Sequence, residues 1–270
     1  MRQEDIDGLG PALAIYDTEL QKRTGRSLRE IACRASRVDE EKVIKVIPKT
    51  KVGVISITAG QGMIPGFAEA VRDIINYLGF YAFVPGATDV AGIVKAIEQG
   101  SKVIFMADDE RFVAFNLSTR LIVDNAEATG RGYGAALEGL AGGLEGHSVL
   151  VIGAGLVGTG AAEILNEMGT QIGVYDRKVL RAEWMARKVE GTVEGNLEGA
   201  LQRYSILLDA SPASGIIEAR HIRPTTMIAA PGIPLGLTAE ARLRIKDRLI
   251  HDPLQIGVAA MMISSVAMTD

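Results

Sequence analysis

Several features are scarce in this chain of 270 residues. It has a single cysteine, Cys33, three histidines, 5% aromatic residues and a net charge of only −4. One cysteine excludes an intrachain disulfide and fits a reducing compartment, so we expect a cytoplasmic protein. Because there is no basic surplus to neutralise phosphates, we do not expect nucleic acid as a partner. The apolar segment 256–268 is too short to cross a bilayer, so we do not expect a membrane partner either.

Metal-binding patterns are missing as well. The sequence contains no H-E-x-x-H, no C-x-x-C and no other clustered ligand spacing, so we expect no metal. His147 and His221 fall in segments that we expect to be structural or peripheral. His251 lies near the end of an expected strand and is the only histidine placed for catalysis, although ordinary solvation is the simpler interpretation.

What the chain does contain is a glycine pattern typical of dinucleotide binding. A strand over 149–152 runs into the sequence G-A-G-L-V-G, which opens a helix. The first glycine permits the sharp turn, the second lets a pyrophosphate approach the backbone, and the third lets the helix pack on the strand. The free amides at the start of this helix favour a phosphate. We therefore expect cofactor contacts from Gly153, Gly155, Leu156, Val157 and Gly158.

An acidic residue closes this motif. The helix over 156–168 and the strand over 171–175 deliver Asp176 to a strand end, where its carboxylate can hold both ribose hydroxyls. A carboxylate there disfavours the 2′-phosphate of NADP, and although Arg177 and Arg181 nearby weaken that preference slightly, NAD is the predicted cofactor. The alternative is a glycine-rich turn that binds no ligand. Loops after later strands are expected to face the nicotinamide. The remaining predicted cofactor contacts are Arg177, Ser211, Pro212 and Pro231.

The order of predicted elements indicates an α/β protein of two domains. Two helices come first, and the second, over 27–35, has the Ser27 and Glu30 spacing of a capping box. Strands then alternate with helices, which implies parallel sheets built by right-handed crossovers. We expect residues 1–128 to form a substrate domain with covering helices. Residues 129–270 should form a doubly wound Rossmann domain with a closing C-terminal helix.

The rim of a second site is predicted in the N-terminal half. Ligands of open α/β sheets bind beyond the carboxyl ends of strands, which selects the turn from Thr58 to Gln61 and the pair Asp108-Asp109. Paired carboxylates can hold ammonium groups or exchange protons with them, which mildly favours a cationic substrate such as an amine. Alternatively, one of the two caps the following turn. Asn125 is ambiguous, because asparagine favours turns for its own backbone reasons.

These rim segments resemble the pyrrolysine synthase family over nearly the whole chain. The resemblance is carried by residues 52–64, 106–109, 230–234 and 253–257. It implies an NAD-dependent oxidation of the terminal amine of L-lysine-Nε-3-methyl-D-ornithine to a semialdehyde. Loss of ammonia and closure of the pyrroline ring would then give pyrrolysine. Other possibilities are a dehydrogenase of another small amino or hydroxy acid and a non-catalytic, NAD-responsive binding module.

The resemblance also implies site residues. Asp108 should hold the substrate ammonium and Asn125 should hydrogen-bond within the substrate pocket, so both are assigned to the catalytic set. The chain departs from the family at three of these positions. Ala59 and Gln61 stand where the family has serine and asparagine, and Asp252 stands where it has glutamate. The expected partner is a small, dipeptide-like substrate, and a homodimer is the assembly considered. The full substrate-binding set is Thr58, Ala59, Gln61, Asp108, Asn125 and Asp252.

Overall fold

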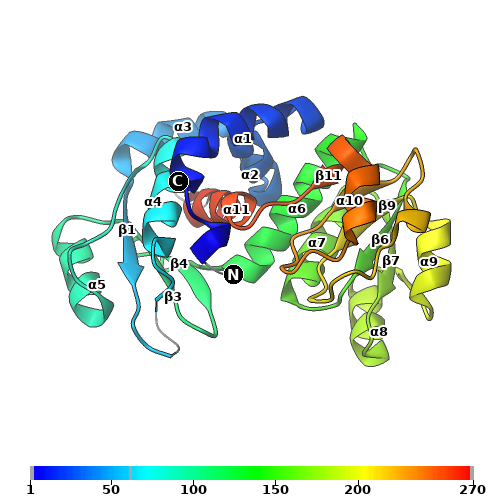
Figure 1. The fold of residues 1–270 in the computed structure, drawn as a ribbon. Coiled ribbons are helices and arrows are strands. Elements are labelled where there is room, and N and C mark those ends of the chain that lie inside the picture. Colours follow the sequence, from blue (N-terminus) through cyan, green and yellow to red (C-terminus); the bar gives the residue numbers. More distant parts are fainter. Residues whose placement is uncertain (1–2, 61–62, 268–270) are drawn as a thin grey trace. The chain divides into compact units, whose positions relative to one another are not determined.

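The computed structural model describes residues 3–60 and 63–267. Its contacts divide the chain into two compact units, whose secondary structure is drawn in Figure 1. Unit 1 consists of Met1–Glu19, Ser27–Ala128 and Pro253–Asp270, and unit 2 of Leu20–Arg26 and Thr129–Asp252. The predicted α/β fold class, with a helical N-terminal region and a Rossmann-type sheet, is confirmed. We had expected 253–270 to belong to the second domain, but this segment groups with unit 1.

Unit 1 begins with helices and continues as an open sheet. Its helices are α1 (Leu9–Thr24), α2 (Leu28–Ser36), α3 (Glu40–Val46), α4 (Phe67–Tyr77), α5 (Asp89–Glu98) and α11 (Gln255–Val266). Its strands are β1 (Lys51–Ser56), β2 (Tyr81–Phe83), β3 (Val103–Ala107), β4 (Phe112–Asn116) and β5 (Ile122–Asp124). The capping box predicted for α2 is present, with Ser27 and Glu30 bonding each other's backbone amides.

The sheet of unit 1 has the order β2-β1-β3-β4-β5. Its first three strands are parallel, as expected, but β4 runs antiparallel to β3 and β5 antiparallel to β4. A tight turn between β3 and β4 returns the chain directly, so no crossover helix is needed there. Successive side chains of a strand point to opposite faces, and Ile55 and Ile104 pack with Ala96 of α5 on one face. In Figure 1, α4 and α5 lie on either side of β1.

Helix α11 is the buried centre of unit 1. Every residue of α11 except Ser264 is buried, and the helix contacts α2, α4 and β4. Two polar contacts fix its position. The Ser264 hydroxyl lies 2.8 Å from that of Ser36, and the Asn116 side chain donates to the Ser265 carbonyl at 2.8 Å. A helix that is apolar all round needs cover on every side, and unit 1 provides it.

Unit 2 is a parallel, doubly wound sheet. Its helices are α6 (Asn125–Ala141, entering from unit 1), α7 (Leu156–Glu167), α8 (Val179–Lys188), α9 (Leu197–Arg203) and α10 (Ala239–Ile245). Its strands are β6 (Ser148–Ile152), β7 (Gln171–Tyr175), β8 (Thr192–Val193), β9 (Ile206–Asp209), β10 (Met227–Ala229) and β11 (Leu249–Ile250). The strand order is β11-β10-β9-β6-β7-β8, and the order reverses between β6 and β9. In such sheets the crevice at this reversal binds the ligand.

Helix α6 runs without a break from Asn125 to Ala141. Gly130 and Gly134 allow it to pack closely on α7. A Cβ atom on Gly130 would lie 2.0 Å from the Val157 carbonyl oxygen. Among the residues that the structure describes, no helix is both long and apolar enough to cross a membrane.

Candidate functional site

The glycine turn of unit 2 forms a cradle at the reversal of the sheet. Gly153 has φ +96°, and a Cβ atom there would lie 2.9 Å from the Ala210 carbonyl oxygen. A Cβ on Gly158 would lie 1.8 Å from the Gly153 carbonyl oxygen, so only glycine lets α7 pack this closely. By contrast, a Cβ on Gly155 would meet nothing within 4 Å. Gly155 is the N-cap of α7 and makes no side-chain cap, so the first amides of α7 are left for an anion.

Asp176 connects this turn to the next strand end. Its Oδ2 accepts a hydrogen bond from the Ala154 amide at 2.7 Å, and its Oδ1 accepts one from the Lys178 amide at 2.7 Å. Each oxygen of a carboxylate has more than one acceptor site, so ribose hydroxyls can still bind. The two bonds hold the carboxylate beside the glycine turn, as the cofactor prediction requires.

A cavity of about 620 Å³ lies beside these residues. This volume is within the usual range of cofactor pockets. Five predicted cofactor residues line it, namely Gly153, Asp176, Arg177, Ser211 and Pro212. The cavity, the open space at Gly155 and the free amides of α7 fit a dinucleotide. Pro231 does not line the cavity, but the loop that contains it packs on the Ser211 segment, since a Cβ on Gly232 would lie 2.5 Å from the Ser211 carbonyl oxygen.

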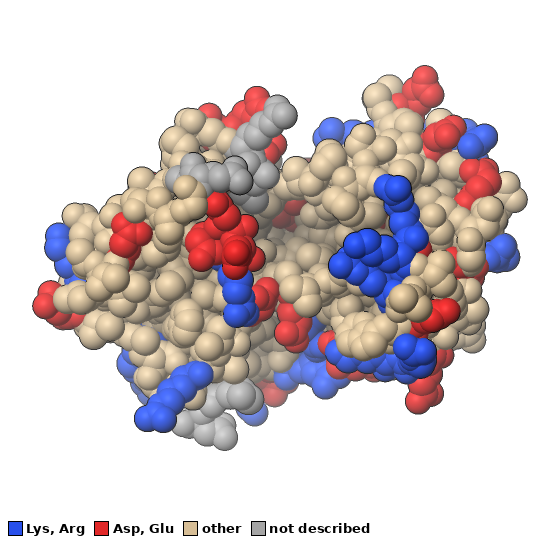
Figure 2. Space-filling view, turned by 90° about the horizontal axis from the view of Figure 1, so that it is seen from below, with Lys and Arg blue, Asp and Glu red and all other residues tan. Residues whose placement is uncertain are grey.

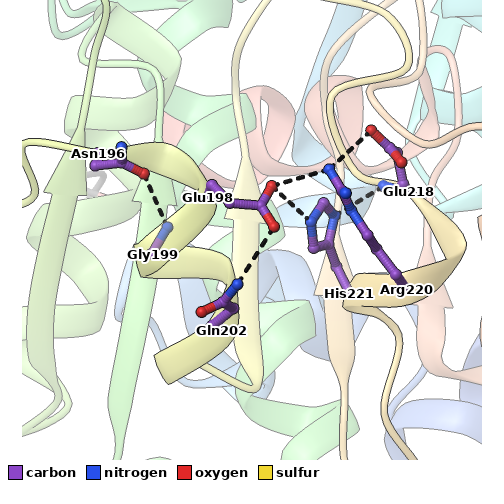
Figure 3. A network of polar contacts seen from close by, with 7 residues as sticks. All are labelled: Asn196, Glu198, Gly199, Gln202, Glu218, Arg220 and His221. Atoms are coloured by element: carbon purple, nitrogen blue, oxygen red, sulfur yellow. Dashed lines mark hydrogen bonds and ion pairs between the residues drawn. The ribbon is translucent and has the colours of Figure 1, made fainter.

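A network of polar contacts around the buried His221 side chain lies next to the cavity; its Glu198, Glu218 and Arg220 side chains are exposed (Figure 3). Leu197 lines the cavity at the start of α9, and the next residue, Glu198, contacts the ring nitrogen Nε2 of His221 at 3.1 Å. The other nitrogen, Nδ1, accepts the Glu218 amide at 3.0 Å, so neutral His221 carries its hydrogen on Nε2 and donates to Glu198. Arg220 contacts Glu198 at 3.1 Å. This arrangement assigns His221 a structural role in holding α9.

Unit 1 contains a separate cavity of about 460 Å³ at the carboxyl ends of β1 and β3. Most of its lining is apolar, and it includes Phe67 and Phe112, whose rings pack edge to face with centroids 5.3 Å apart. Its polar lining comes from Ser56, Asp108 and Asp109. An aliphatic chain that ends in a charged amine matches this combination of apolar walls and carboxylates.

Asp108 is fixed by the turn between β3 and β4. Its Oδ1 accepts hydrogen bonds from the Arg111 amide at 2.8 Å and the Glu110 amide at 2.9 Å. These backbone bonds, that of Arg111 above all, lower the pKa of the Asp108 carboxyl. The side chain is therefore an ionised, hydrogen-bond-accepting group at neutral pH. Asp108 does cap its own turn, and the same bonds hold its charge at the cavity.

The turn after β1 approaches the same hairpin. Gly60 has φ +79°, and a Cβ there would lie 2.0 Å from Oδ2 of Asp109. Thr58 and Ala59 are exposed and do not line the cavity, although Ser56 and Ile57 do. Instead, the Thr58 amide and hydroxyl donate to the Asp89 carboxylate at 2.8 and 2.7 Å. Gln61 lies outside the described residues.

Two predicted substrate residues are used elsewhere. Asn125 begins α6, does not line the cavity and donates from Nδ2 to the sulfur of Met261 at 3.2 Å. Asp252 belongs to unit 2, is only 5% exposed, and accepts the Tyr133 hydroxyl at 3.0 Å. The placement of Asp252 does not support direct substrate binding, because burial and the Tyr133 bond occupy its carboxylate. A direct role for Asn125 stays a prediction.

The unit 2 cavity has a basic side, because Arg177, Lys178 and Arg181 are among its lining residues. On the face drawn in Figure 2, Lys and Arg side chains are interspersed with Asp and Glu and form no continuous basic surface. Among the described residues, no three His, Cys, Asp or Glu side chains gather so that they could hold a metal ion. Burial raises the pKa of the Cys33 thiol to about 12, so this cysteine is not a thiolate at neutral pH.

Sequence reasoning missed the apolar part of the unit 1 site. Phe67, Phe112 and Met63 line the cavity, yet no spacing distinguishes a lining aromatic residue from a core one. The one available signal was the position of Phe67, just after the glycine-rich turn that follows β1. In unit 2, Leu197 and Ile216 were missed for the same reason.

Solved structures share this fold at low sequence identity. Quinate dehydrogenase from Corynebacterium glutamicum, in complex with NAD, is 15% identical, covers 82% of this chain and 93% of its own, and has a TM-score of 0.55. Shikimate 5-dehydrogenase from Thermus thermophilus, in complex with NADP(H) and shikimate, is 15% identical. It covers 80% of this chain and 92% of its own, with a TM-score of 0.52. These likenesses show the fold; the first protein was solved with NAD and the second with NADP(H).

Sequence comparisons are more specific. The family described as "Pyrrolysine biosynthesis protein PylD, N-terminal domain" matches residues 5–123, and "Alanine dehydrogenase/PNT, C-terminal domain" matches 123–230. Pyrrolysine synthase from Methanosarcina acetivorans is 34% identical over 79% of this chain and 82% of its own. That from Methanosarcina barkeri is 29% identical over 97% of this chain and 95% of its own. The chain therefore belongs to the pyrrolysine synthase family.

Proposed function

We propose that this chain is an NAD-dependent dehydrogenase that completes pyrrolysine. The substrate is L-lysine-Nε-3-methyl-D-ornithine, whose terminal amine is oxidised. The observation that carries the proposal is Asp108, an ionised carboxylate fixed at the mouth of an otherwise apolar cavity in unit 1. Membership of the pyrrolysine synthase family and the dinucleotide cradle of unit 2 support it.

The cavity residues bind and orient the substrate. The Asp108 carboxylate accepts a charge-assisted hydrogen bond from the ornithyl ammonium, which is stronger than a neutral one. Phe67 and Phe112 cover the aliphatic part of the chain and exclude water from it. Asp108 has a lowered pKa and keeps its charge, so it holds the ammonium and is not itself a proton donor at neutral pH.

The dinucleotide is bound by unit 2. The α7 amides and Gly155 would receive the pyrophosphate and Asp176 would receive the ribose hydroxyls, a set that supports NAD because a 2′-phosphate would meet a carboxylate. When bound, NAD supplies the hydride acceptor. The substrate carbon would lose a hydride to NAD and its ammonium nitrogen would lose a proton to water, which gives an iminium ion. Water replaces the nitrogen as ammonia and leaves an aldehyde. The ornithyl α-amine condenses with that aldehyde, water is lost, and the pyrroline ring closes.

The charge of Asp108 can be tested without disturbing its turn. In Asp108→Asn, the amide oxygen still accepts the Glu110 and Arg111 bonds. Loss of a charge-assisted bond should lower kcat/KM by about 100-fold. NAD affinity should stay within about twofold, because the cofactor is bound by unit 2. The matched control is Glu110→Gln, which removes a negative charge from the same exposed turn and should keep most of the activity.

The assay combines the dipeptide-like substrate with NAD and follows reduced cofactor at about 340 nm together with product mass. A loss of NAD affinity in Asp108→Asn, or an equal loss of activity in Glu110→Gln, would contradict the role of Asp108. Turnover of shikimate or a simple amino acid in preference to the dipeptide would contradict the proposed substrate.

A further inference from the structure

A buried aspartate that no step above uses lies at the reversal of the unit 2 sheet. Asp209 is the last residue of β9, where it is paired with Ile152 of β6, and it is fully buried. Its Oδ1 accepts the Ser211 hydroxyl at 2.7 Å and the Ser211 amide at 3.1 Å. Asp209 thus fixes both the backbone and the side chain of a residue that lines the dinucleotide cavity.

The other oxygen of Asp209 has no hydrogen-bond partner. Oδ2 is buried and packs on the α-carbon of Gly236, because a Cβ at that position would lie 1.8 Å from it. Burial raises the pKa of this carboxyl to about 6, against the lowering effect of the Ser211 bonds. Burying a carboxyl group is costly when one of its oxygens accepts no hydrogen bond. A valine or alanine would fill this place in the core at lower cost, so the side chain needs a reason beyond packing.

The segment that Asp209 fixes is pressed against the cofactor turn. A Cβ on Gly153 would lie 3.0 Å from the Ser211 nitrogen, and one on Gly232 would lie 2.5 Å from the Ser211 oxygen. Ser211 therefore sits between the glycine turn and the loop after β10. A shift of Ser211 would therefore displace the glycine turn or the loop after β10.

We propose that Asp209 is a positioning residue for the dinucleotide, which acts by fixing Ser211 against the Gly153 turn. It does not touch the cofactor. The proposal rests on the proposed function only in taking the unit 2 cavity as a nicotinamide dinucleotide site. It adds a residue outside the glycine motif on which cofactor affinity depends.

Two substitutions of Asp209 separate positioning from simple packing. Asp209→Asn retains an oxygen that can accept both Ser211 bonds, and Asp209→Ala removes it. We expect Asp209→Ala to raise the Kd for NAD about tenfold, which corresponds to the loss of about one well-made hydrogen bond. KM for NAD should rise in parallel while kcat changes less than about threefold. Asp209→Asn should restore the affinity to within about threefold of the wild type.

The control is Ile228→Val in β10, which removes a buried methylene from the same core away from the cavity. It should lower the melting temperature and leave the Kd unchanged.

Binding is followed by NADH fluorescence with no substrate present, using NAD and NADP as competitors. If Asp209→Ala is folded by circular dichroism and binds NAD as the wild type does, the inference is overturned. If Asp209→Ala does not fold, a tenfold weakening in Ser211→Ala supports it and unchanged binding overturns it. Absence of dinucleotide binding by the wild type would instead overturn the proposed function.

Discussion

Asp89 in unit 1 and Asp209 in unit 2 each accept both the amide and the hydroxyl of a residue that follows a strand end. Asp89 accepts the amide and hydroxyl of Thr58 after β1, and Asp209 accepts those of Ser211 after β9. Asp89 is partly exposed, and the bonds from Thr58 lower its pKa, whereas burial raises the pKa of Asp209. The hydrogen bonds lower the pKa of the carboxyl at both positions. At Asp209, burial outweighs them and the net pKa is raised.

The raised pKa of Asp209 predicts a stability that falls with rising pH. The folded state holds the proton with a pKa of about 6, against 3.8 for the free side chain. The stabilisation is complete below pH 3.8 and is lost as the pH rises through 6. The total loss is about 3 kcal/mol, and roughly half of it falls between about pH 5 and about pH 7.5.

Urea unfolding of the wild type and of Asp209→Asn at these two pH values measures this effect. The amide does not titrate, so the difference between the two proteins isolates the carboxyl. We expect the free energy of unfolding of the wild type, relative to Asp209→Asn, to be lower at the higher pH. A difference that does not change with pH would show that the carboxyl titrates in the folded state as it does in the unfolded chain.

At the scale of elements, the glycine turn between β6 and α7 combines two requirements that substitution can separate. Gly158 is needed for folding, since a Cβ there would lie 1.8 Å from the Gly153 carbonyl oxygen. Gly155 faces open space and has φ −89°, which alanine adopts without strain. Its lack of a side chain serves the approach of a phosphate.

Alanine at each position should therefore give a different result. Gly158→Ala should lower the free energy of unfolding by about 2 kcal/mol or more, because backbone must move. Gly155→Ala should cost less than about 1 kcal/mol but weaken NAD binding about tenfold or more, since the methyl group occupies the space of the pyrophosphate. Thermal unfolding and NADH fluorescence distinguish the two effects. Equal destabilisation by both, with unchanged NAD affinity in Gly155→Ala, would contradict the cradle.

The elements that carry local patterns were predictable, and those set by distant contacts were not. The spacing from Gly153 to Asp176 located the Rossmann motif because each glycine has its own steric reason. The close packing of α6 on α7 could not be predicted, since nothing in the local sequence shows that Gly130 faces Val157. For α11, the apolar sequence indicated burial but not that unit 1 would provide the cover.

At the scale of the whole molecule, the predicted strand-end positions agree with the two cavities better than the predicted side-chain contacts do. Asp108 was predicted because a strand end places it at a rim, and it lines the unit 1 cavity. Asp252 was assigned to the substrate from a family resemblance, but Tyr133 occupies it inside unit 2. Position along a strand is readable from sequence, whereas the direction of a side chain depends on neighbours far away in the chain.

In the proposed reaction, substrate held by Asp108 gives a hydride to NAD held by unit 2. The most direct measurement uses L-lysine-Nε-3-methyl-D-ornithine that carries two deuterium atoms on the δ-carbon of the ornithyl group. Mass spectrometry then follows the label in the cofactor and in the product. We predict reduced NAD with one deuterium and pyrrolysine with the other, formed in equal amounts. Reduced NAD without deuterium, or no reduction with this substrate while a simple amino or hydroxy acid is oxidised, would contradict the account.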